Sequence, residues 1–216
     1  MSNTAYDVRV RTSDRPARRV APRRRLSVDE RREELLRLGM QLFSSRAYEE
    51  IWVEEIAELA GISRGLLYHY FPTKRDFYVA VSRAAAAEAG ELTVPDPSLP
   101  PAERLRSGID AFVRYAEEHS QGFLTAYRGS LAGDSEVREI VEEGRQRQAT
   151  RILGTVSPDA EPSAVLRLAV HGWIALAQSV IARWLEERDA PREAVCDLLI
   201  GALLGVISAA HDADGG

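Results

Sequence analysis

The chain has 216 residues, 45% hydrophobic and 28% charged, with 28 basic and 33 acidic side chains and a formal net charge of −5. This composition excludes a disordered chain and is typical of a folded protein with a sizeable core. A single cysteine excludes an internal disulfide, and no apolar segment follows the N-terminal arginines as in a secretion signal, so we expect a soluble, cytoplasmic protein.

The first 25 residues are strongly basic. They contain eight arginines and two acidic residues, a net charge of +6, which leaves −11 for residues 26–216. With two prolines and few large apolar side chains, residues 1–25 cannot build a core, and we predict a disordered, arginine-rich tail. A polyanion such as DNA is the expected partner of the tail. The alternative is a solvated leader that only adds solubility.

Two helices are predicted next. Ser27 and Glu30 form the S-x-x-E pattern of a capping box, which predicts a helix from Val28 to about Ser45. A second helix begins at Val53, where apolar residues recur at helical spacing, and Gly61 ends it.

A short third helix, residues 64–70, follows after a tight turn and is ended by Pro72. Thr73 caps a fourth helix that runs to about Gly90. Two short helices joined by a tight turn form a helix-turn-helix unit, so residues 26–90 are predicted to be a DNA-binding domain. Helical spacing assigns Ile62, Leu67 and Phe71 to the core and leaves a set of outward residues to read DNA: Arg64, Gly65, Leu66, Tyr68 and His69.

The C-terminal half is also predicted to be helical. The segment LTVPDPSLPP, residues 92–101, has four prolines and marks a boundary. Five helical patterns follow, and no strand pattern of useful length: 102–120, 122–132, 135–154, 163–187 and 191–211. The last two are apolar on nearly every side, which predicts that they pack both on their own core and on a second copy of the chain. The longest apolar run, 194–210, contains Asp197 and is shorter than the ~18–20 residues that cross a bilayer, so we expect no membrane partner.

Residues 91–216 are therefore predicted to form a ligand-binding and dimerisation domain. The side chains most able to line a pocket among its helices are aromatic or polar-tipped, with plain core packing as the alternative for each: Phe112, Tyr115, Phe123, Tyr127, His171, Trp173 and Gln178. Arg128 is expected either to pair with an acidic group of a ligand or to cap a helix end.

The sequence segment on which the DNA-binding prediction rests resembles a known family. Residues 48–81 read YEEIWVEEIAELAGISRGLLYHYFPTKRDFYVAV, and over residues 28–82 the chain resembles the tetracycline-repressor (TetR) family of bacterial transcriptional regulators. The resemblance implies an all-α fold, a homodimer on a palindromic DNA operator, and a C-terminal half that varies with its small-molecule ligand. It implies DNA contacts by residues 64–66 and 68–70, and a phosphate contact by Lys74, the only lysine of the chain.

Two positions depart from the family pattern. Trp52 stands where a threonine usually caps the second helix, and an indole cannot supply that cap. Leu66 replaces a commonly small or hydroxylated residue, which favours an apolar contact with a thymine methyl group over a hydrogen bond.

Catalysis is not expected. The four histidines are scattered, and the sequence has no metal-ligand spacing, Gly-rich phosphate loop or serine nucleophile elbow, so neither a metal nor a cofactor is predicted. The predicted function is that of a ligand-responsive, sequence-specific DNA-binding regulator, a repressor released from its operator by a small, largely apolar effector. The alternative is a DNA-binding regulator or architectural protein without a small-molecule ligand.

Overall fold

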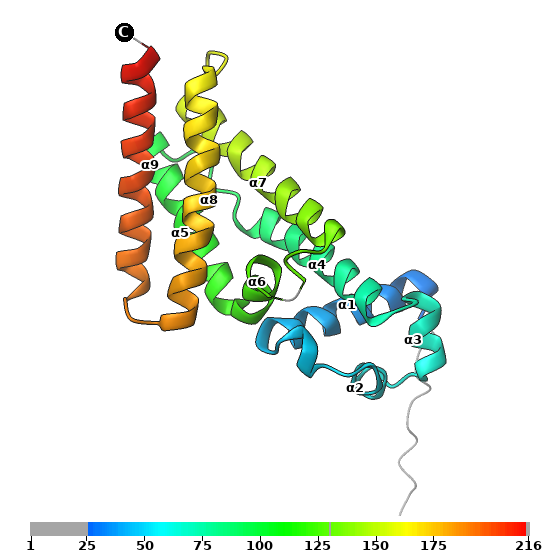
Figure 1. Cartoon of the computed structure of the whole chain (residues 1–216). Coiled ribbons are helices and arrows are strands. Elements are labelled where there is room, and N and C mark those ends of the chain that lie inside the picture. The colour runs from blue at the N-terminus through cyan, green and yellow to red at the C-terminus, as the bar shows by residue number, and fades with distance from the viewer. Residues whose placement is uncertain (1–25, 130, 215–216) are drawn as a thin grey trace, which may run out of the picture.

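The computed structural model describes residues 26–129 and 131–214, and within these ranges all of the regular secondary structure is helical, as predicted (Figure 1). A short 3-10 helix, η1 (Tyr48–Glu50), separates the first two of nine α-helices in the described ranges: α1 Val28–Ser45, α2 Val53–Leu59, α3 Arg64–Tyr70, α4 Lys74–Leu92, α5 Pro101–Glu118, α6 Ser120–Tyr127, α7 Ser135–Val156, α8 Ala164–Glu187 and α9 Arg192–Asp214. The predicted disorder of residues 1–25 lies outside the described residues.

Local caps fix the helix starts that the sequence predicts. Ser27 and Glu30 form the reciprocal capping box of α1, and the Thr73 hydroxyl accepts a hydrogen bond from the Asp76 amide at 3.0 Å at the start of α4. Gly61 adopts φ 63°, the left-handed conformation that lets the chain turn sharply between α2 and α3. The helix-turn-helix unit is therefore confirmed.

The helix α6 is shorter than expected, because it ends at Tyr127 instead of near residue 132. The Gly129 amide donates hydrogen bonds to the carbonyls of Leu124 and Thr125. A Cβ at Gly129 would lie 2.6 Å from the Cα of Thr125, so only glycine permits this return of the chain over the last turn of α6. The strength of this glycine stop is not visible in the helical periodicity of the sequence.

The first core holds the helix-turn-helix unit on α1 and α4. Leu35, Ile56 and Leu67 are buried there, and the rings of Phe71 and Phe77 meet edge to face at 4.9 Å. The helix α7 also contributes to this core, with the buried side chains of Val137 and Ile140. The end of the molecule that carries α2 and α3, called the DNA-reading end below, therefore shares its interior with a helix of the C-terminal half.

The helices α1 and α4 cross closely at a glycine. A Cβ at Gly39 would lie 2.4 Å from Val81 and 2.7 Å from Phe77, both of which are buried side chains. The missing side chain lets the two helices approach, which sets the position of the helix-turn-helix unit relative to α4.

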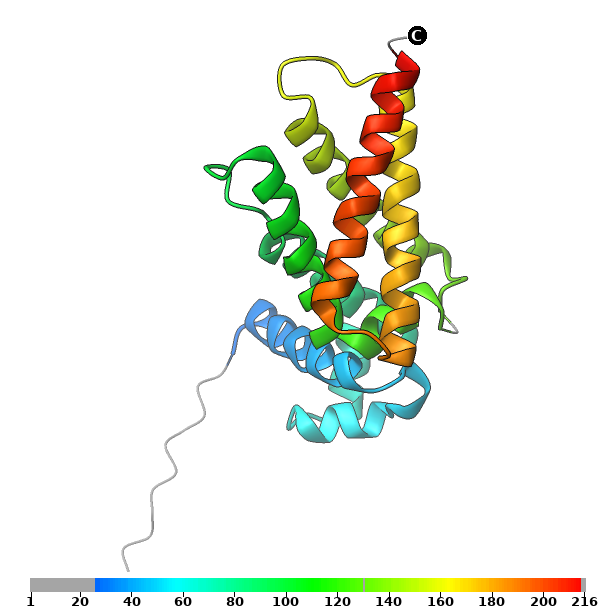
Figure 2. The same cartoon turned by 90° about the vertical axis from the view of Figure 1, so that its left-hand side faces the viewer.

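The second core lies between α5, α7, α8 and α9. The long helices α8 and α9 lie side by side along one edge of the molecule in both views, and α2 and α3 lie at the other end (Figures 1 and 2). The indole of Trp173 on α8 donates a hydrogen bond to the carbonyl of Leu199 on α9 at 2.9 Å, so the pair is joined by a buried polar contact as well as by apolar packing.

A charged cluster links the DNA-reading end to α7. Arg75, in the first turn of α4, donates from Nε and Nη2 to the two carboxylate oxygens of Asp134 at 2.6 and 2.9 Å, and from Nη1 to Glu136 at 2.9 Å. Asp134 is also the N-cap of α7, because its carboxylate accepts from the Glu136 and Val137 amides. One carboxylate therefore fixes the start of α7 to the start of α4.

Candidate DNA-binding face and effector pocket

The outer face of α3 is the first candidate site. The Ser63 hydroxyl caps the helix by accepting a hydrogen bond from the Leu66 amide at 3.2 Å, and Leu67 is buried beneath it. The five residues predicted to point outward are all exposed: Arg64, Gly65, Leu66, Tyr68 and His69. This is the form in which the second helix of a helix-turn-helix unit enters the major groove.

An ion pair connects the starts of α2 and α3. Arg64 Nη1 lies 2.9 Å from Glu54 Oε1, and both side chains are more than half exposed. An exposed pair of this kind is weak, so its breaking opposes DNA binding only slightly. Glu54 thus holds the Arg64 guanidinium at the surface, where a phosphate or a guanine edge can replace the carboxylate.

Trp52 precedes α2 and Lys74 begins α4, the helices before and after α3 in the chain. Trp52 is 68% exposed, and its indole ring supplies no side-chain cap to α2, as expected from the sequence. The Lys74 ammonium lies 4.2 Å from the centroid of the Tyr48 ring, and burial lowers the pKa of Lys74. Because Lys74 stands in the first turn of α4, the free amides and helix dipole there also favour an anion.

Tyr70 differs from the other residues for which the family resemblance implies DNA contact. Its side chain is partly buried and packs against the first core, with its ring 6.4 Å from that of Phe71. Tyr70 is therefore divided between the core and the surface, whereas Tyr68 and His69 are free of the core.

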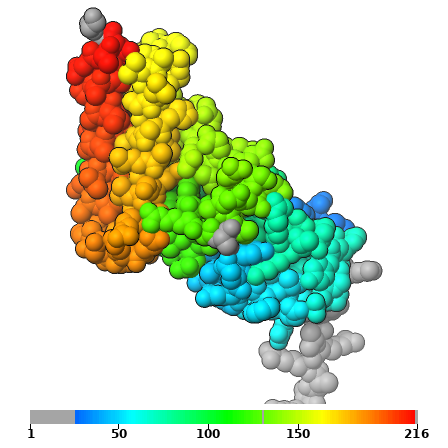
Figure 3. All heavy atoms as spheres, viewed as in Figure 1, coloured from blue at the N-terminus to red at the C-terminus, as the bar shows by residue number. Residues whose placement is uncertain are grey.

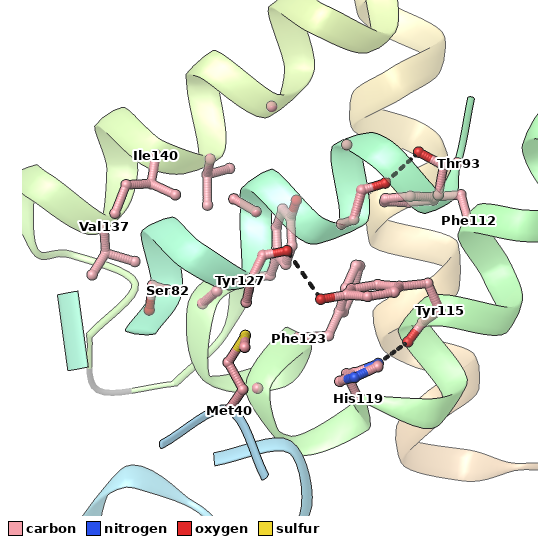
Figure 4. A pocket seen from close by; sticks show the side chains of 18 of the residues that line it. Met40, Ser82, Thr93, Phe112, Tyr115, His119, Phe123, Tyr127, Val137 and Ile140 are labelled. Carbon is pink, nitrogen blue, oxygen red and sulfur yellow. Dashed lines mark hydrogen bonds between the residues drawn. The ribbon is translucent and has the colours of Figure 1, made fainter. Parts of the chain in front are cut away.

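The second candidate site is a cavity of about 160 Å³ between α1, α4, α5, α6 and α7, with one residue of α8 in its wall. Figure 4 shows side chains from these elements surrounding it, including Met40 of α1 and Ser82 of α4. Five of the predicted pocket residues line it together: Phe112, Tyr115, Phe123, Tyr127 and Gln178. The cavity extends farther toward the DNA-reading end than the sequence predicts, because α1 and α4 form part of its wall.

Hydrogen bonds fix the polar groups of this wall. The Tyr115 hydroxyl donates to the carbonyl of Ala85 at 3.0 Å, and the ring of Tyr115 stacks on His119 with centroids 4.2 Å apart (Figure 4). Gln178 donates to the Tyr127 hydroxyl at 3.1 Å, and burial raises the pKa of Tyr127 to about 12. The tyrosines are therefore neutral at physiological pH and give the cavity a mainly apolar character.

The other predicted pocket residues lie elsewhere. Trp173 lines a second cavity of about 70 Å³. Arg128 and His171 line neither cavity: Arg128 donates to Glu186 at 2.6 Å, which attaches the end of α6 to α8, and His171 is partly exposed on α8.

Sequence reasoning missed the charged residues of the cavities. Arg147 and Arg151 of α7 line the first cavity, and Arg104 of α5 lines the second. The segment around the α7 arginines, EEGRQRQATR, is typical of a solvent-exposed helix face. Their spacing of four residues places them on the same face of α7, which is the only local signal that they act together.

A helix-turn-helix unit joined through α4 to a helical domain with an apolar cavity is the arrangement of a ligand-responsive DNA-binding regulator, in which one polypeptide carries both functions. Comparison with known proteins identifies the family of regulators. Residues 35–81 match the family model for bacterial regulatory proteins of the tetR family, and residues 101–205 match the tetracyclin repressor-like C-terminal domain.

Similar proteins support the same assignment. A crystal structure of a tetR-family transcriptional regulator from Streptomyces coelicolor is 33% identical, with a TM-score of 0.81 over 88% of this chain and 86% of that one. The transcriptional regulator AcuR of Cereibacter sphaeroides is 30% identical over 74% of this chain and 78% of its own length. The transcriptional activator FasR of Mycolicibacterium smegmatis is 27% identical over 86% of both chains. The chain belongs to the tetR family of transcriptional regulators, which are ligand-responsive DNA-binding proteins.

Proposed function

We propose that this regulator is a cytoplasmic repressor that binds a palindromic operator as a homodimer and leaves it when a small, largely apolar effector enters the cavity described above. The observation that carries the proposal is the double position of α4. Its first turn holds Lys74 and Arg75 at the DNA-reading end, and its later turns, from Tyr78 to Gly90, line the cavity. A change at the cavity therefore acts on a helix that ends at the DNA.

The exposed faces of α8 and α9 support the homodimer. Leu168 is 73% exposed and Leu198 58% exposed, and Figure 3 shows α8 and α9 side by side as one continuous outer surface. Nothing lies within 4 Å of a Cβ at Gly201 or Gly205, so a second backbone can approach closely there. Two such faces from two copies of the chain bury each other as a four-helix bundle.

The same two helices are long and apolar enough to cross a membrane by length and composition alone. Each nevertheless buries one side in the second core, with Trp173, Ile174 and Ile181 of α8 packed against α9 residues such as Leu199 and Leu203. Core helices of water-soluble proteins pass the same test, and the family assignment favours a cytoplasmic regulator over a membrane protein.

DNA recognition is assigned to the α3 face and the residues beside it. Tyr68 and His69 supply groups for base edges, and Leu66 supplies an apolar contact for a thymine methyl group. Arg64 and Lys74 supply cations, and Trp52 supplies an exposed ring at the start of α2. Two copies related by a two-fold axis read half-sites ~34–36 Å apart, or a multiple of that distance.

Effector release follows from differential affinity. A ligand shifts the regulator away from DNA only if it binds better to a form whose two α3 helices no longer match the half-site spacing. A coupling of ~1–3 kcal/mol, typical of allosteric pairs, changes operator affinity by roughly 5- to 150-fold, and the operator weakens the effector by the same factor.

Genome-wide footprinting of the protein's binding sites tests the proposal. We expect symmetric, paired contacts, with the genes beside each site indicating the effector class. Asymmetric, unpaired footprints would contradict the dimer on a palindrome. A screen in which molecules occupy the cavity and never weaken operator binding would favour the alternative, a DNA-binding or architectural protein without an effector. Expression of the neighbouring genes in a deletion strain distinguishes repression from activation.

A further inference from the structure

The two cavities described above share a wall. Residues from α5, α7, α8 and the end of α4 line both of them: Thr93, Phe112, Gln148, Arg151 and Gln178. The remaining lining is mainly apolar, and its charged side chains are all arginines, with Arg147 on one side of the shared wall and Arg104 on the other. No acidic residue within 26–129 or 131–214 lines either cavity.

Arg151 stands at the junction with part of its hydrogen-bonding capacity unused. Its Nη2 donates to the Gly90 carbonyl at 2.6 Å and its Nη1 to the Thr93 hydroxyl at 3.3 Å. A guanidinium has five N–H donors, so further donors remain for a ligand. No ion pair joins Arg151 to an acidic side chain in the described part of the chain.

The surroundings of Arg151 disfavour an uncompensated positive charge. Burial, and secondly the nearby charge of Arg147, lower the pKa of Arg151. An anion at the junction would oppose both effects, because it would pair with a half-buried guanidinium that has no carboxylate of its own.

Arg104 adds an unpaired donor on the other side of the junction. Its Nη2 donates to the carbonyls of Pro97 and Leu99, but its Nε is buried without a hydrogen-bond partner among the described residues. Buried polar groups in native proteins are nearly always paired, so the unpaired Nε of this cavity-lining arginine leaves a donor for an acceptor that displaces its surroundings.

A purely structural role explains only part of this arrangement. Arg151 acts as a cation at the C-terminal end of α4, where free carbonyls favour positive charge. That role accounts for its bonds to Gly90 and Thr93. It does not account for the unused donors of Arg151, the unpaired Arg104 Nε or the absence of acidic residues from two adjoining apolar cavities within the described ranges.

We infer that the effector is an amphipathic anion, a medium-chain carboxylate whose acid group is bound at the junction by Arg151 with Arg104, and whose chain lies in the larger cavity. This inference rests on the proposed effector role of that cavity. A cavity of ~150 Å³ takes a benzene molecule, so cavities of about 160 and 70 Å³ suit a chain of medium length better than a long one.

The position of Arg151 also connects the acid group to DNA. Arg151 holds the last turn of α4 through Gly90, and α4 begins 16 residues earlier with Lys74 at the DNA-reading end. A carboxylate that draws the guanidinium toward the junction competes with the Gly90 carbonyl. The acid group therefore acts directly on the helix that positions the helix-turn-helix unit.

Calorimetric titration of the full chain with octanoate and with 1-octanol tests the inference, because the two probes share a chain and differ in charge. We expect octanoate to bind at least tenfold more tightly than octanol. Arg151→Gln should abolish this preference while octanol binding is retained. Arg138→Gln is the matched control, since it removes an exposed arginine from the same helix outside both cavities and should change neither probe.

Further variants guard against a folding defect. Arg151→Lys keeps the charge and should restore part of the preference. Arg104→Gln leaves the bonds between Arg151 and α4 in place and should still weaken octanoate several-fold. Equal affinity for the two probes in the native chain, or an unchanged preference in Arg151→Gln, overturns the inference and leaves the effector role of the cavity standing. Failure of both probes to bind also overturns it.

Operator binding separates the inference from the proposed function. If octanoate binds through Arg151 but never weakens binding to the footprinted operator, acid recognition stands and the release mechanism fails. If octanoate releases the operator in the native chain and not in Arg151→Gln, with octanol weak in both, the inference and the proposed function are supported together.

Discussion

A substitution at Gly65 can distinguish the contribution of this residue to the stability of α3 from its contribution to DNA binding. A Cβ built at Gly65 meets nothing nearer than the Ser63 hydroxyl oxygen at 3.9 Å, and Gly65 is not one of the glycines with positive φ. Alanine therefore fits without a clash. Because alanine is favoured over glycine in a helix by up to ~1 kcal/mol, we expect Gly65→Ala to raise Tm by about 2–4 °C.

Operator binding should change in the opposite direction. The added methyl group lies on the exposed face of α3, between Leu66 and Arg64, and prevents the backbone from approaching the groove closely. Loss of one good base contact, worth ~1–3 kcal/mol, lowers operator affinity by roughly 5- to 150-fold and leaves binding to random DNA nearly unchanged.

The control is Gly154→Ala on α7, where nothing lies within 4 Å of the added Cβ. It should raise Tm by a similar amount and leave operator affinity unchanged. Circular dichroism at a fixed protein concentration gives Tm, and fluorescence anisotropy with operator and random duplexes gives the affinities. Unchanged operator affinity for Gly65→Ala would refute the close approach of α3 to DNA, and a lower Tm would refute the absence of a packing role.

Tyr68→Ala should weaken binding to the operator more than to random DNA, and equal losses on both in anisotropy titrations would make the ring a positioning group only. Lys74→Ala should weaken binding to all sequences and lower the slope of log K against log salt by about one unit if a phosphate contact is lost. Deletion of residues 1–24 keeps the α1 capping box, so circular dichroism should show an intact fold while affinity and salt slope fall; an unchanged slope would leave the tail without a DNA role. Asp134→Asn keeps the cap of α7 and loses the charge paired with Arg75, whose hydrogen bond lowers the pKa of Asp134. The variant should therefore be less stable than the native chain at neutral pH. In thermal unfolding, the difference should begin to shrink only as pH falls below about 4 and should vanish below the lowered pKa of Asp134, and a difference that persists there would contradict the ion pair.

The DNA-reading end was predictable because its signals are local. The Ser27 and Thr73 caps, Gly61 and Pro72 each specify a helix end within a few residues. Helical spacing alone separates the buried Leu67 from the exposed Tyr68.

The effector pocket was only partly predictable. Aromatic side chains such as Phe123 and Tyr127 are evident candidates in any helical domain. Arg151 is not, because its role depends on how α7 packs on the end of α4, 61 residues away from Gly90 in sequence. Arg128 has the same difficulty, because its partner Glu186 is 58 residues distant and no local pattern indicates the pair.

The shared interior of the DNA-reading end has a consequence for engineering. Because Val137 and Ile140 of α7 belong to the first core, a DNA-binding domain that is cut from the chain before α7 would expose apolar surface that the full chain covers. Chimaeras that join this DNA-binding domain to the ligand-binding domain of a relative should therefore keep the first two turns of α7 and its Asp134 cap together with the DNA-binding domain. In evolutionary terms, the DNA-binding half can exchange partners freely only where that short piece of the sensor half is exchanged as well.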